Sequence, residues 1–379
     1  MEGLTSPDAW SSLEGRRVLV RVDFNCPVAE INGRLEVTDD FRIRATLPLF
    51  RDLQSRGATV VAATHFGRPQ GRVVEEFSVE PLRRRLDELC PGVELLENLR
   101  FSPGEEGNDP QFGASLVEGV DFFINEAFSA SHRAHASIMV PPTLVPSAAG
   151  PNLIREVETL DRLLTSPERP FVAIVGGAKV KDKLGIVKVL AEKADTVIVG
   201  GGMAYTFAAA MGRSIGTSLF DPTRLEDCAN LMATGRVVIP VDALTLPSDS
   251  PFGAGGDAVP VVVEGDIPEG SQGLDIGPRS AQTFAEIIAD ARTILWNGPM
   301  GVFEDERLRE GTAAVARAVA ASPAVSVVGG GDSVAALQLF GLEEEVSFVS
   351  TGGGASLEFL EYGDLPGLRA LREGRGGGQ

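Results

Sequence analysis

Cysteine and histidine are both scarce in this chain. The cysteines are Cys26, Cys90 and Cys228, and the histidines are His65, His132 and His135. An odd number of cysteines without a CxxC pair is typical of a reducing compartment, so we expect a cytoplasmic protein. The histidines are scattered and have no cysteine near them in the sequence. We therefore expect no structural zinc site.

Long apolar runs and excess positive charge are also missing. No run approaches the ~20 apolar residues that a membrane-spanning helix needs, and the N-terminal MEGLTSPDAW lacks the features of a signal peptide. The 34 Lys and Arg residues are outnumbered by 53 Asp and Glu residues, which gives a net charge of −19. General electrostatic attraction to nucleic acid or to an acidic membrane is therefore not expected, and an anionic ligand would need a local basic patch. No apolar surface stripe requires a partner, so we expect a monomer.

The 379 residues are enough for two domains of ordinary size. Short runs rich in β-branched residues alternate with segments of helical length. The expected strands are 17–23, 58–63, 93–96, 120–124, 171–175, 195–199, 236–241, 291–296, 324–328 and 346–349. This alternation predicts parallel sheets flanked by helices, with ligands at the carboxyl ends of the strands. We expect an α/β fold of two Rossmann-like domains with a cleft between them.

A segment after the fourth expected strand separates the two halves. It begins with the proline-rich MVPPTLVPSAAGPN and continues through a helical stretch at 153–164 to SPERP. Clusters of Pro and Gly mark connections, so we place a hinge helix at 153–170 between domains 1–152 and 171–362. The C-terminal REGRGGGQ is predicted to be a flexible tail.

Lysine is confined to one short stretch. All five lysines lie between 179 and 193, and every other basic residue is arginine. A general bias toward arginine explains the overall preference, but it does not explain why lysine is kept at the start of one predicted helix. We infer that a compact charge on a flexible stem is needed there.

Polar side chains follow the strands of the N-terminal half. Asp23 and Asn25 end the first strand in RVDFNCP, and the next three strands lead into HFGRP, ENLRF and HRAHAS. The cationic or titratable groups are Arg42, His65, Arg68, Arg100 and Arg133. Together they predict a site for a phosphate and a carboxylate. Two structural alternatives stay open, an Asx turn at Asp23 and Asn25 and arginines that only pair with surface carboxylates. We expect His132 and His135 to make local hydrogen bonds.

In the C-terminal half, VGGAKVKDK (175–183) follows a strand and opens a predicted helix. Glycines let a phosphate approach the backbone, and the helix N-terminus supplies free N–H donors. Lys179 and Lys183 are spaced i,i+4 and are expected on one helix face, whereas Lys181 and Lys188 are expected in solvent. The pattern is not a Walker A loop. An ordinary glycine-rich turn is the alternative.

Three similar turns follow, VGGGMAYTF (199–207), VGGGDSVAA (328–336) and STGGGASLE (350–358). The candidate phosphate-binding glycines are Gly177, Gly201, Gly202, Gly330, Gly331, Gly352, Gly353 and Gly354. Four such turns predict a polyphosphate site, and none has the GxGxxG pattern of dinucleotide binding. Asp332 follows one triglycine and is a candidate ligand for Mg²⁺, with a helix N-cap as the alternative.

The turn WNGPMGVFE (296–304) ends another expected strand. Its Asn297 and Glu304 are candidates for contact with a nucleoside, although a purely structural turn fits the spacing equally well. LDIGPRS (274–280) predicts a helix that starts at Pro278, and we assign it no chemistry.

Ten motifs in order make the chain resemble the phosphoglycerate kinase family over nearly its whole length. They are RVDFNCP, HFGRP, LLENLRF, HRAHAS, PERPFVAIVGGAKVKDKLG, IVGGGMAYTF, LDIGP, WNGPMGVFE, GGGDS and STGGGASLE. The resemblance implies reversible phosphoryl transfer, in glycolysis and with Mg²⁺. The acyl phosphate of 1,3-bisphosphoglycerate and ADP would give 3-phosphoglycerate and ATP.

The resemblance also implies roles for particular residues. Those implied for phosphoglycerate are Asp23, Asn25, Arg42, His65, Arg68, Arg100 and Arg133. Those implied for the nucleotide and its metal are Lys179, Lys183, Asn297, Glu304, Asp332, Ser333 and the glycines 352–354. Arg42, Lys179 and Lys183 form the expected catalytic set, brought together by hinge closure. The resemblance further implies that residues from about 363 return to the N-terminal domain.

The chain departs from the family pattern beside the triose site. The usual NDAFGTAHRAH is NEAFSASHRAH here, so Glu126 replaces an aspartate and Ser129 a glycine. Two interpretations are compatible with this pattern. The chain is an enzyme slowed by these changes, or it is a non-catalytic protein that binds a nucleotide or an anion. A nicotinamide-dependent oxidoreductase is the other alternative, and the missing fingerprint counts against it.

Overall fold

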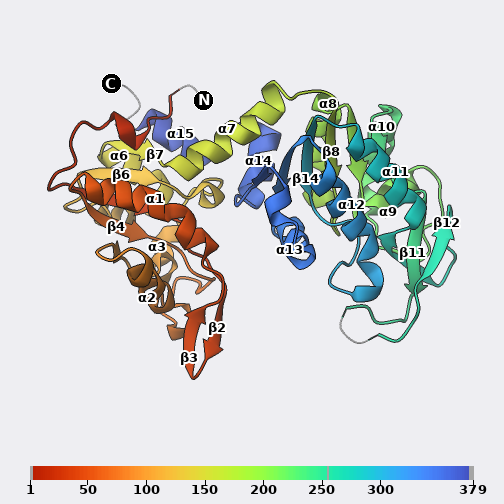
Figure 1. The fold of residues 1–379 in the computed structure, drawn as a ribbon, viewed down its shortest axis with the longest axis horizontal. Coiled ribbons are helices and arrows are strands. Elements are labelled where there is room, and N and C mark those ends of the chain that lie inside the picture. The colour runs from red at the N-terminus through yellow and green to blue at the C-terminus, as the bar shows by residue number, and fades with distance from the viewer. Residues whose placement is uncertain (1–2, 254–255, 375–379) are drawn as a thin grey trace. The chain divides into compact units, whose positions relative to one another are not determined.

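The computed structural model describes residues 3–253 and 256–374 (Figure 1). It divides into unit 1, Met1–Thr159 with Tyr362–Gln379, and unit 2, Leu160–Glu361. The helix α7 (Pro151–Thr165) contains the boundary between them. The last five residues of the expected flexible tail lie outside the described residues. Within the described part of the chain, no helix has the length and apolar character to cross a membrane.

Unit 1 is built on a five-stranded parallel sheet of order β5-β4-β1-β6-β7. Its strands are β1 (Arg17–Arg21), β4 (Thr59–Ala63), β5 (Glu94–Leu95), β6 (Phe122–Asn125) and β7 (Ser147–Ala149). The central strands are almost wholly buried because their apolar runs are covered on both faces. The strand order reverses between β1 and β6, which is where such sheets bind ligands.

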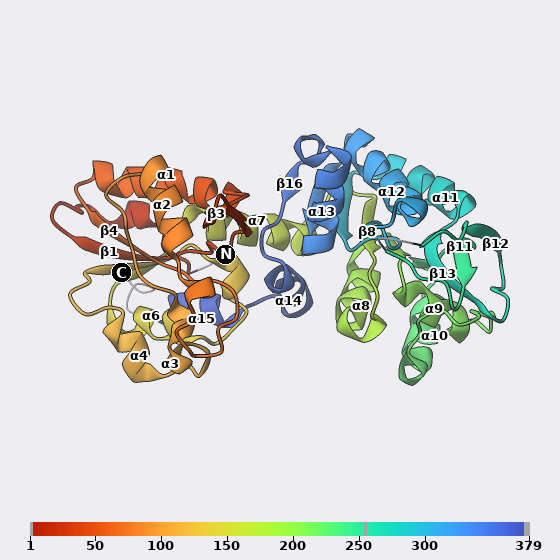
Figure 2. The same cartoon turned by 90° about the horizontal axis from the view of Figure 1, so that it is seen from below.

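Helices cover both faces of this sheet. They are α1 (Phe41–Ser55), α2 (Glu80–Leu89), α3 (Pro103–Glu106), α4 (Pro110–Ser115), α5 (Ala136–Met139), α6 (Pro141–Leu144) and α15 (Pro366–Glu373). Figure 2 shows α1 and α2 on one side and α3, α4, α6 and α15 on the other. The C-terminal α15 packs against α5, α6 and β7, and the N–H of Gly367 donates to the carbonyl of Ser131 at 2.8 Å.

Two parts of unit 1 differ from the sequence-based expectation. The proline-rich segment at 139–152 is not a connector, because it contains α6 and β7, and β7 pairs with β6 in the sheet of unit 1. A hairpin of β2 (Val28–Ile31) and β3 (Arg34–Val37) was not expected. Its turn has positive φ at Asn32 and Gly33. The Asn-Gly pair was the signal that could have predicted it.

Unit 2 has a six-stranded parallel sheet of order β10-β9-β8-β14-β15-β16. The strands are β8 (Phe171–Val175), β9 (Thr196–Val199), β10 (Val237–Val238), β14 (Thr293–Asn297), β15 (Val325–Gly329) and β16 (Phe348–Val349). The helices are α8 (Leu184–Lys193), α9 (Met203–Ala210), α10 (Leu225–Ala233), α11 (Pro278–Ala289), α12 (Glu310–Ala321), α13 (Gly331–Phe340) and α14 (Gly354–Tyr362). Figure 2 shows α8, α9 and α10 opposite α11, α12 and α13. Both sheets are parallel and flanked by helices, so the expected fold class is confirmed.

A second, antiparallel sheet in unit 2 was not expected. It consists of β11 (Asp242–Pro247) between β12 (Val261–Glu264) and β13 (Ser271–Ile276). The sequence SQGLDI of β13 has few β-branched residues, so local propensity did not reveal it. Pairing with β11 creates the strand, and its residues Gly273 and Leu274 line a cavity described below.

Candidate active site

A cavity of about 270 Å³ lies at the carboxyl ends of the strands of unit 1. The residues that line it are Asp23, Asn25, His65, Gly67, Arg68, Arg100, Ser129, Ala130, His132, Arg133 and His135. They follow β1, β4, β5 and β6, so parallel strands bring together side chains that are far apart in the sequence. Of the seven residues expected to bind phosphoglycerate, only Arg42 is absent from the lining.

Arg42 lies on α1 and reaches Asp23, a member of the lining. Its guanidinium forms an ion pair with the Asp23 carboxylate, and the Ser129 hydroxyl donates to the same oxygen. Burial alone would raise the pKa of Asp23, but the interactions with His65, Arg42 and Ser129 hold that pKa well below its usual range. Asp23 is therefore ionised, and it connects Arg42 to the cavity.

The Asx turn considered as a structural alternative is present and is part of the cavity wall. The backbone N–H of Asn25 donates to Asp23 Oδ1 at 3.0 Å, and Asn25 Oδ1 accepts the N–H of Gly67 at 2.9 Å. Arg100 donates to the Gly67 carbonyl at 2.8 Å. Gly67 has a φ of +58°, where a side chain is disfavoured. Loops after three strands are thus fixed to one another around the cavity.

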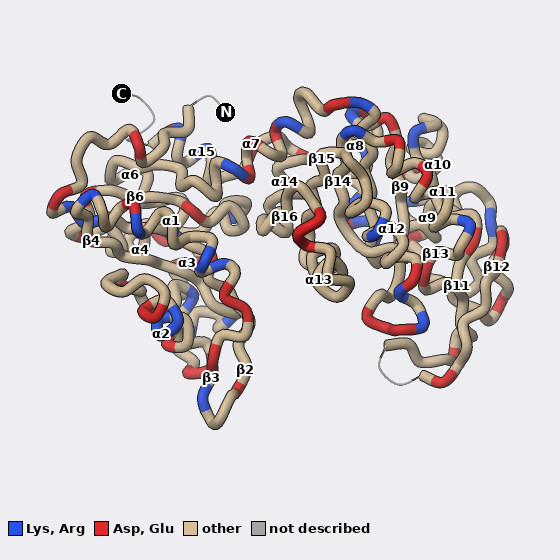
Figure 3. The backbone as a smooth tube through the Cα atoms, viewed as in Figure 1, with Lys and Arg blue, Asp and Glu red and all other residues tan. Residues whose placement is uncertain are grey.

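The arginines of the cavity differ in their partners. Arg100 is buried and lies 3.2 Å from Glu106, as the ion-pair alternative suggested. Arg68 and Arg133 form no ion pair with any carboxylate of residues 3–253 or 256–374, although Arg133 donates to the ring of His132 at 3.1 Å. Figure 3 shows acidic and basic positions interspersed over the backbone of both units. Arg68 and Arg133 thus leave two guanidinium groups at this cavity without a carboxylate partner among the described residues.

Sequence reasoning missed part of this site. His132 and His135 were expected only to make local hydrogen bonds, but both line the cavity. Burial and the nearby arginines lower the pKa of His135 to about 4, so its ring is neutral at physiological pH. Arg21, Glu105 and Ser137 lie behind the cavity and were not singled out, because one strand-end arginine and one glutamate carry no distinctive pattern.

A second cavity, of about 440 Å³, lies in unit 2. Its lining consists of Gly177, Ala178, Gly201, Gly202, Thr217, Leu219, Phe252, Gln272, Gly273, Leu274, Pro299, Gly301, Val302, Glu304 and Asp332. Three of the four glycine-rich turns contribute, together with the turn after β14. This cavity combines backbone walls with an apolar part, which suits a phosphate chain and a flat ring respectively.

The first two glycine turns approach each other closely at this cavity. A Cβ atom on Gly201 would lie 2.6 Å from the backbone nitrogen of Gly177, and the two residues have φ values of +65° and +118°. Any side chain at Gly201 would therefore separate the turns, which explains why glycine stands there.

The two lysines do not share a helix face, so that expectation was wrong. Residues Val180–Asp182 form a 3-10 turn and α8 begins only at Leu184. Lys179 is exposed, whereas Lys183 Nζ donates to the Gly176 carbonyl at 2.7 Å and to Asn297 Oδ1 at 2.8 Å. Burial lowers the pKa of Lys183 to about 8. Asn297 is thus occupied by Lys183 and does not line the second cavity.

Other expected nucleotide residues support the cavity from outside its lining. Ser333 is buried and accepts the N–H of Gly298 at 2.5 Å, which holds the turn after β14. Gly330, with a φ of +89°, is the N-cap of α13, so the N-cap alternative for Asp332 is wrong. Gly331 and the fourth turn, Gly352–Gly354, are likewise absent from the lining.

Asp332 is the one expected metal ligand. Its carboxylate is exposed at the cavity in the first turn of α13. Across the described ranges, no group of three or more His, Cys, Asp or Glu residues is arranged to hold a metal ion. A single carboxylate fits Mg²⁺, which usually takes one or two protein carboxylates and completes its octahedron with phosphate oxygens and water.

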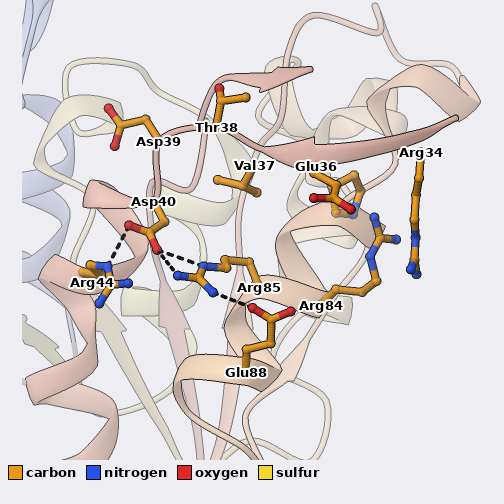
Figure 4. A pocket seen from close by; sticks show the side chains of 11 residues that line it. Arg34, Glu36, Val37, Thr38, Asp39, Asp40, Arg44, Arg84, Arg85 and Glu88 are labelled. Atoms are coloured by element: carbon orange, nitrogen blue, oxygen red, sulfur yellow. Dashed lines mark hydrogen bonds and ion pairs between the residues drawn. The ribbon is translucent and has the colours of Figure 1, made fainter. Parts of the chain in front are cut away.

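A third hollow, of about 510 Å³, lies on unit 1 beside the hairpin (Figure 4). Asp40 binds Arg44 and Arg85 at 2.7 Å each, and Arg85 also pairs with Glu88. Most of its charges are thus satisfied within the protein. Because Asp40 directly precedes α1, this network ties the start of the helix that carries Arg42 to α2.

The fold and the two cavities are those of a two-domain α/β phosphotransferase. The family model of phosphoglycerate kinase matches residues 8–94 and 91–363. A phosphoglycerate kinase of Rubrobacter xylanophilus is 49% identical, covering 95% of this chain and 96% of the relative, and one of Pelotomaculum thermopropionicum is 45% identical, covering 95% and 97%. The solved phosphoglycerate kinase of Coxiella burnetii has a TM-score of 0.86 at 37% identity, covering 97% of this chain and 98% of that one. The chain belongs to the phosphoglycerate kinase family.

Proposed function

We propose that this enzyme transfers a phosphoryl group reversibly between the acyl phosphate of 1,3-bisphosphoglycerate and ADP, which gives 3-phosphoglycerate and ATP. The observation that carries the proposal is the cavity of unit 1, where Arg68 and Arg133 have no carboxylate partner among the described residues of an acidic chain. Guanidinium groups bind carboxylates and phosphates in bidentate fashion, and phosphoglycerate has one of each.

The proposed triose site consists of Asp23, Asn25, Arg42, His65, Arg68, Arg100 and Arg133. Arg68 and Arg133 would bind the charged groups of the ligand directly. Asp23 holds Arg42 by an ion pair, so Arg42 is available at the edge of the cavity for the group that is transferred. Asn25 and Arg100 both bind Gly67 and so keep the loops in place.

The proposed nucleotide site is the cavity of unit 2. Because Gly177, Gly201 and Gly202 carry no side chain, the phosphates would approach the backbone there. The N–H groups of Gly177 and Gly201 themselves donate to the carbonyls of Pro299 and Met300. Glu304 would contact the nucleoside. Asp332 would hold Mg²⁺, which supplies positive charge to the phosphate oxygens. Lys183 and Asn297 would shape the turns rather than contact the nucleotide, because they bind each other.

The proposed mechanism is direct in-line transfer after closure of the two units about α7. The division into residues 1–152 with 363–379, a hinge helix at 153–170, and residues 171–362 is part of this proposal. Arg42 and the exposed Lys179 would flank the transferred group and stabilise its spread negative charge once water is excluded. No general base is needed, because the attacking oxygen is already ionised. We further propose that the enzyme is a cytoplasmic monomer that binds neither nucleic acid nor membranes.

A coupled assay tests the proposal. Purified protein should consume ATP only when both 3-phosphoglycerate and Mg²⁺ are present. ATP binding without this turnover would support the non-catalytic alternative, and saturable enhancement of NADH fluorescence would support the oxidoreductase. Small-angle scattering should show compaction when both substrates are present and not with either one alone.

A further inference from the structure

A buried cluster of polar groups, formed by Arg21, Glu105 and Ser137, lies behind the cavity of unit 1. Arg21, at the end of β1, and Glu105, on α3, have relative exposures of 1% and 0%. Ser137 donates its backbone N–H and its hydroxyl to Glu105 at 2.9 and 2.7 Å, and Arg21 Nε donates to Ser137 Oγ at 2.9 Å. Arg21 Nη2 lies 3.9 Å from Glu105 Oε1. The cluster therefore holds a buried guanidinium in one orientation.

The same guanidinium reaches the ring of His65. Arg21 Nη2 lies 3.2 Å from His65 Nδ1. A guanidinium has only donors and stays protonated in proteins, so it cannot accept a hydrogen bond from the ring. His65 Nδ1 must then be the acceptor. In a neutral imidazole the proton is consequently on Nε2, the nitrogen that remains for the cavity.

The charges around the ring also favour its neutral form. The charged groups that face it are Arg21, Arg42 and Arg100, which oppose protonation, and Asp23, which favours it. Burial is the largest effect and, with the arginines, lowers the pKa of His65 to about 3. Protonation at Nδ1 would also turn two donors, the ring N–H and Arg21, toward each other.

We propose that Arg21 and Glu105 are positioning residues that lock His65 as the neutral Nε2–H tautomer, so that the ring presents one hydrogen-bond donor and no charge to the ligand. Such a donor pairs with an acceptor oxygen, which a carboxylate or phosphate supplies. Arg21 orients the His65 ring through its contact with Nδ1. Glu105 and Ser137 in turn orient the guanidinium of Arg21. The lock does not depend on the proposed function; only the identity of the ligand as phosphoglycerate rests on it.

Nitrogen-15 spectra of the full-length protein labelled at histidine test the lock directly. The chain has three histidines, so His132→Gln and His135→Gln identify the His65 signals. We expect the Nε2–H pattern, unchanged across the range of about pH 5 to 8 in which histidines ordinarily titrate. An Nδ1–H pattern, or titration of His65 within that range, would overturn the proposal. The spectra need no substrate, so their result is independent of the coupled assay.

The variant that tests the cause is Arg21→Met combined with Glu105→Gln, which leaves no unpaired buried charge. We expect mixed tautomers of His65 and an increase of about tenfold in the KM for 3-phosphoglycerate, as for one lost hydrogen bond to a charged group, with the KM for ATP unchanged. Arg17→Met, on the same strand but only half-buried, is the matched control. Arg21→Lys retains a donor and should retain the tautomer even if the double variant does not fold. Two results would contradict the proposal. One is loss of the Nε2–H tautomer of His65 in Arg21→Lys, and the other is an unaltered tautomer in a double variant that folds.

Discussion

Lys183 Nζ donates a hydrogen bond to Asn297 Oδ1 at 2.8 Å, which joins the turn after β8 to the end of β14. These two strands are neighbours at the point where the strand order of unit 2 reverses. The same amine also donates to the carbonyls of Gly176 and Asn297, at 2.7 and 3.2 Å. One lysine side chain therefore links the ends of β8 and β14 beneath the glycine-rich turns.

This lysine should give unfolding a specific pH dependence. Its pKa is lowered from 10.5 to about 8 in the folded protein, so the unfolded chain binds more protons between these values. The contribution of Lys183 to the free energy of unfolding should consequently rise with pH in that window. Lys183→Met should lower the free energy of unfolding by about 1–3 kcal/mol at pH 8, because buried acceptors lose their donor. The difference in free energy of unfolding between the parent and this variant should increase toward pH 10. Denaturant unfolding of both proteins at pH 8 and pH 10 measures this difference. A difference that stays constant between the two pH values would contradict the prediction. Lys188→Met is the control.

Glu126 should produce the opposite trend at lower pH. It is buried and accepts the N–H of Asn152 at the start of α7, and burial raises its pKa from 4.5 to about 8. The folded protein therefore binds more protons than the unfolded chain between pH 4.5 and 8, so this residue's contribution to stability should fall as pH rises. Glu126→Gln should flatten that slope.

Chemical denaturation of the parent and Glu126→Gln at pH 5 and 8 checks the expectation. A parent that loses no more stability than the variant over this interval would refute it. Glu126→Asp restores the residue of the family pattern and, with its shorter side chain, should weaken the bond to Asn152.

Arg42→Ala and Lys179→Ala should each lower kcat strongly, by roughly 10²–10³-fold, because both cations are expected to act on charge that develops during transfer. Ground-state binding of either substrate should change much less. Steady-state kinetics with calorimetry separates the two quantities. Arg44→Ala, on α1 like Arg42, is the control for Arg42→Ala. Lys188→Ala, on the helix α8 that follows Lys179, is the control for Lys179→Ala. A kcat retained in both test variants would remove these residues from the mechanism.

Arg68→Ala should weaken binding of 3-phosphoglycerate by about 10–100-fold, as expected for a lost charge-assisted hydrogen bond. The affinity for ADP should stay near that of the parent, because the proposed nucleotide site lies in unit 2. Titration calorimetry with each ligand tests this, with the exposed Arg72→Ala as control. Equal loss of both ligands would contradict the assignment of one ligand to each unit.

Asp332→Asn should raise the Mg²⁺ concentration needed for half-maximal turnover, since an amide oxygen is a weaker ligand than a carboxylate for this hard cation. A magnesium titration at saturating substrates measures the shift. If the Mg²⁺ dependence of this variant matches that of the parent, Asp332 is not the metal ligand.

Much of the fold was readable from local pattern. The parallel strands were predictable because each is a short apolar run buried on both faces, as in 171–175 and 293–297. The antiparallel β13 was not, because its SQGLDI becomes a strand only by pairing with β11. The cationic residues of unit 1 were predictable in the same way, since polar residues directly after parallel strands meet at one edge.

Side-chain partners were less predictable than positions. The i,i+4 spacing of Lys179 and Lys183 suggested a shared helix face, but the 3-10 turn at Val180–Asp182 separates them and Lys183 turns inward. Likewise, Arg100 has the same strand-end context as Arg68, yet only Arg100 finds a carboxylate.

The sequence alone determined where strands end and which chemical groups follow them, because hydrophobic burial and glycine conformations act over a few residues. The tertiary structure decided which of those groups meet. Arg21 lies 44 positions from His65, and Lys183 lies 114 positions from Asn297. Such pairs form only after strand order and packing bring the ends together, and low-dielectric burial then sets which side chains carry charge.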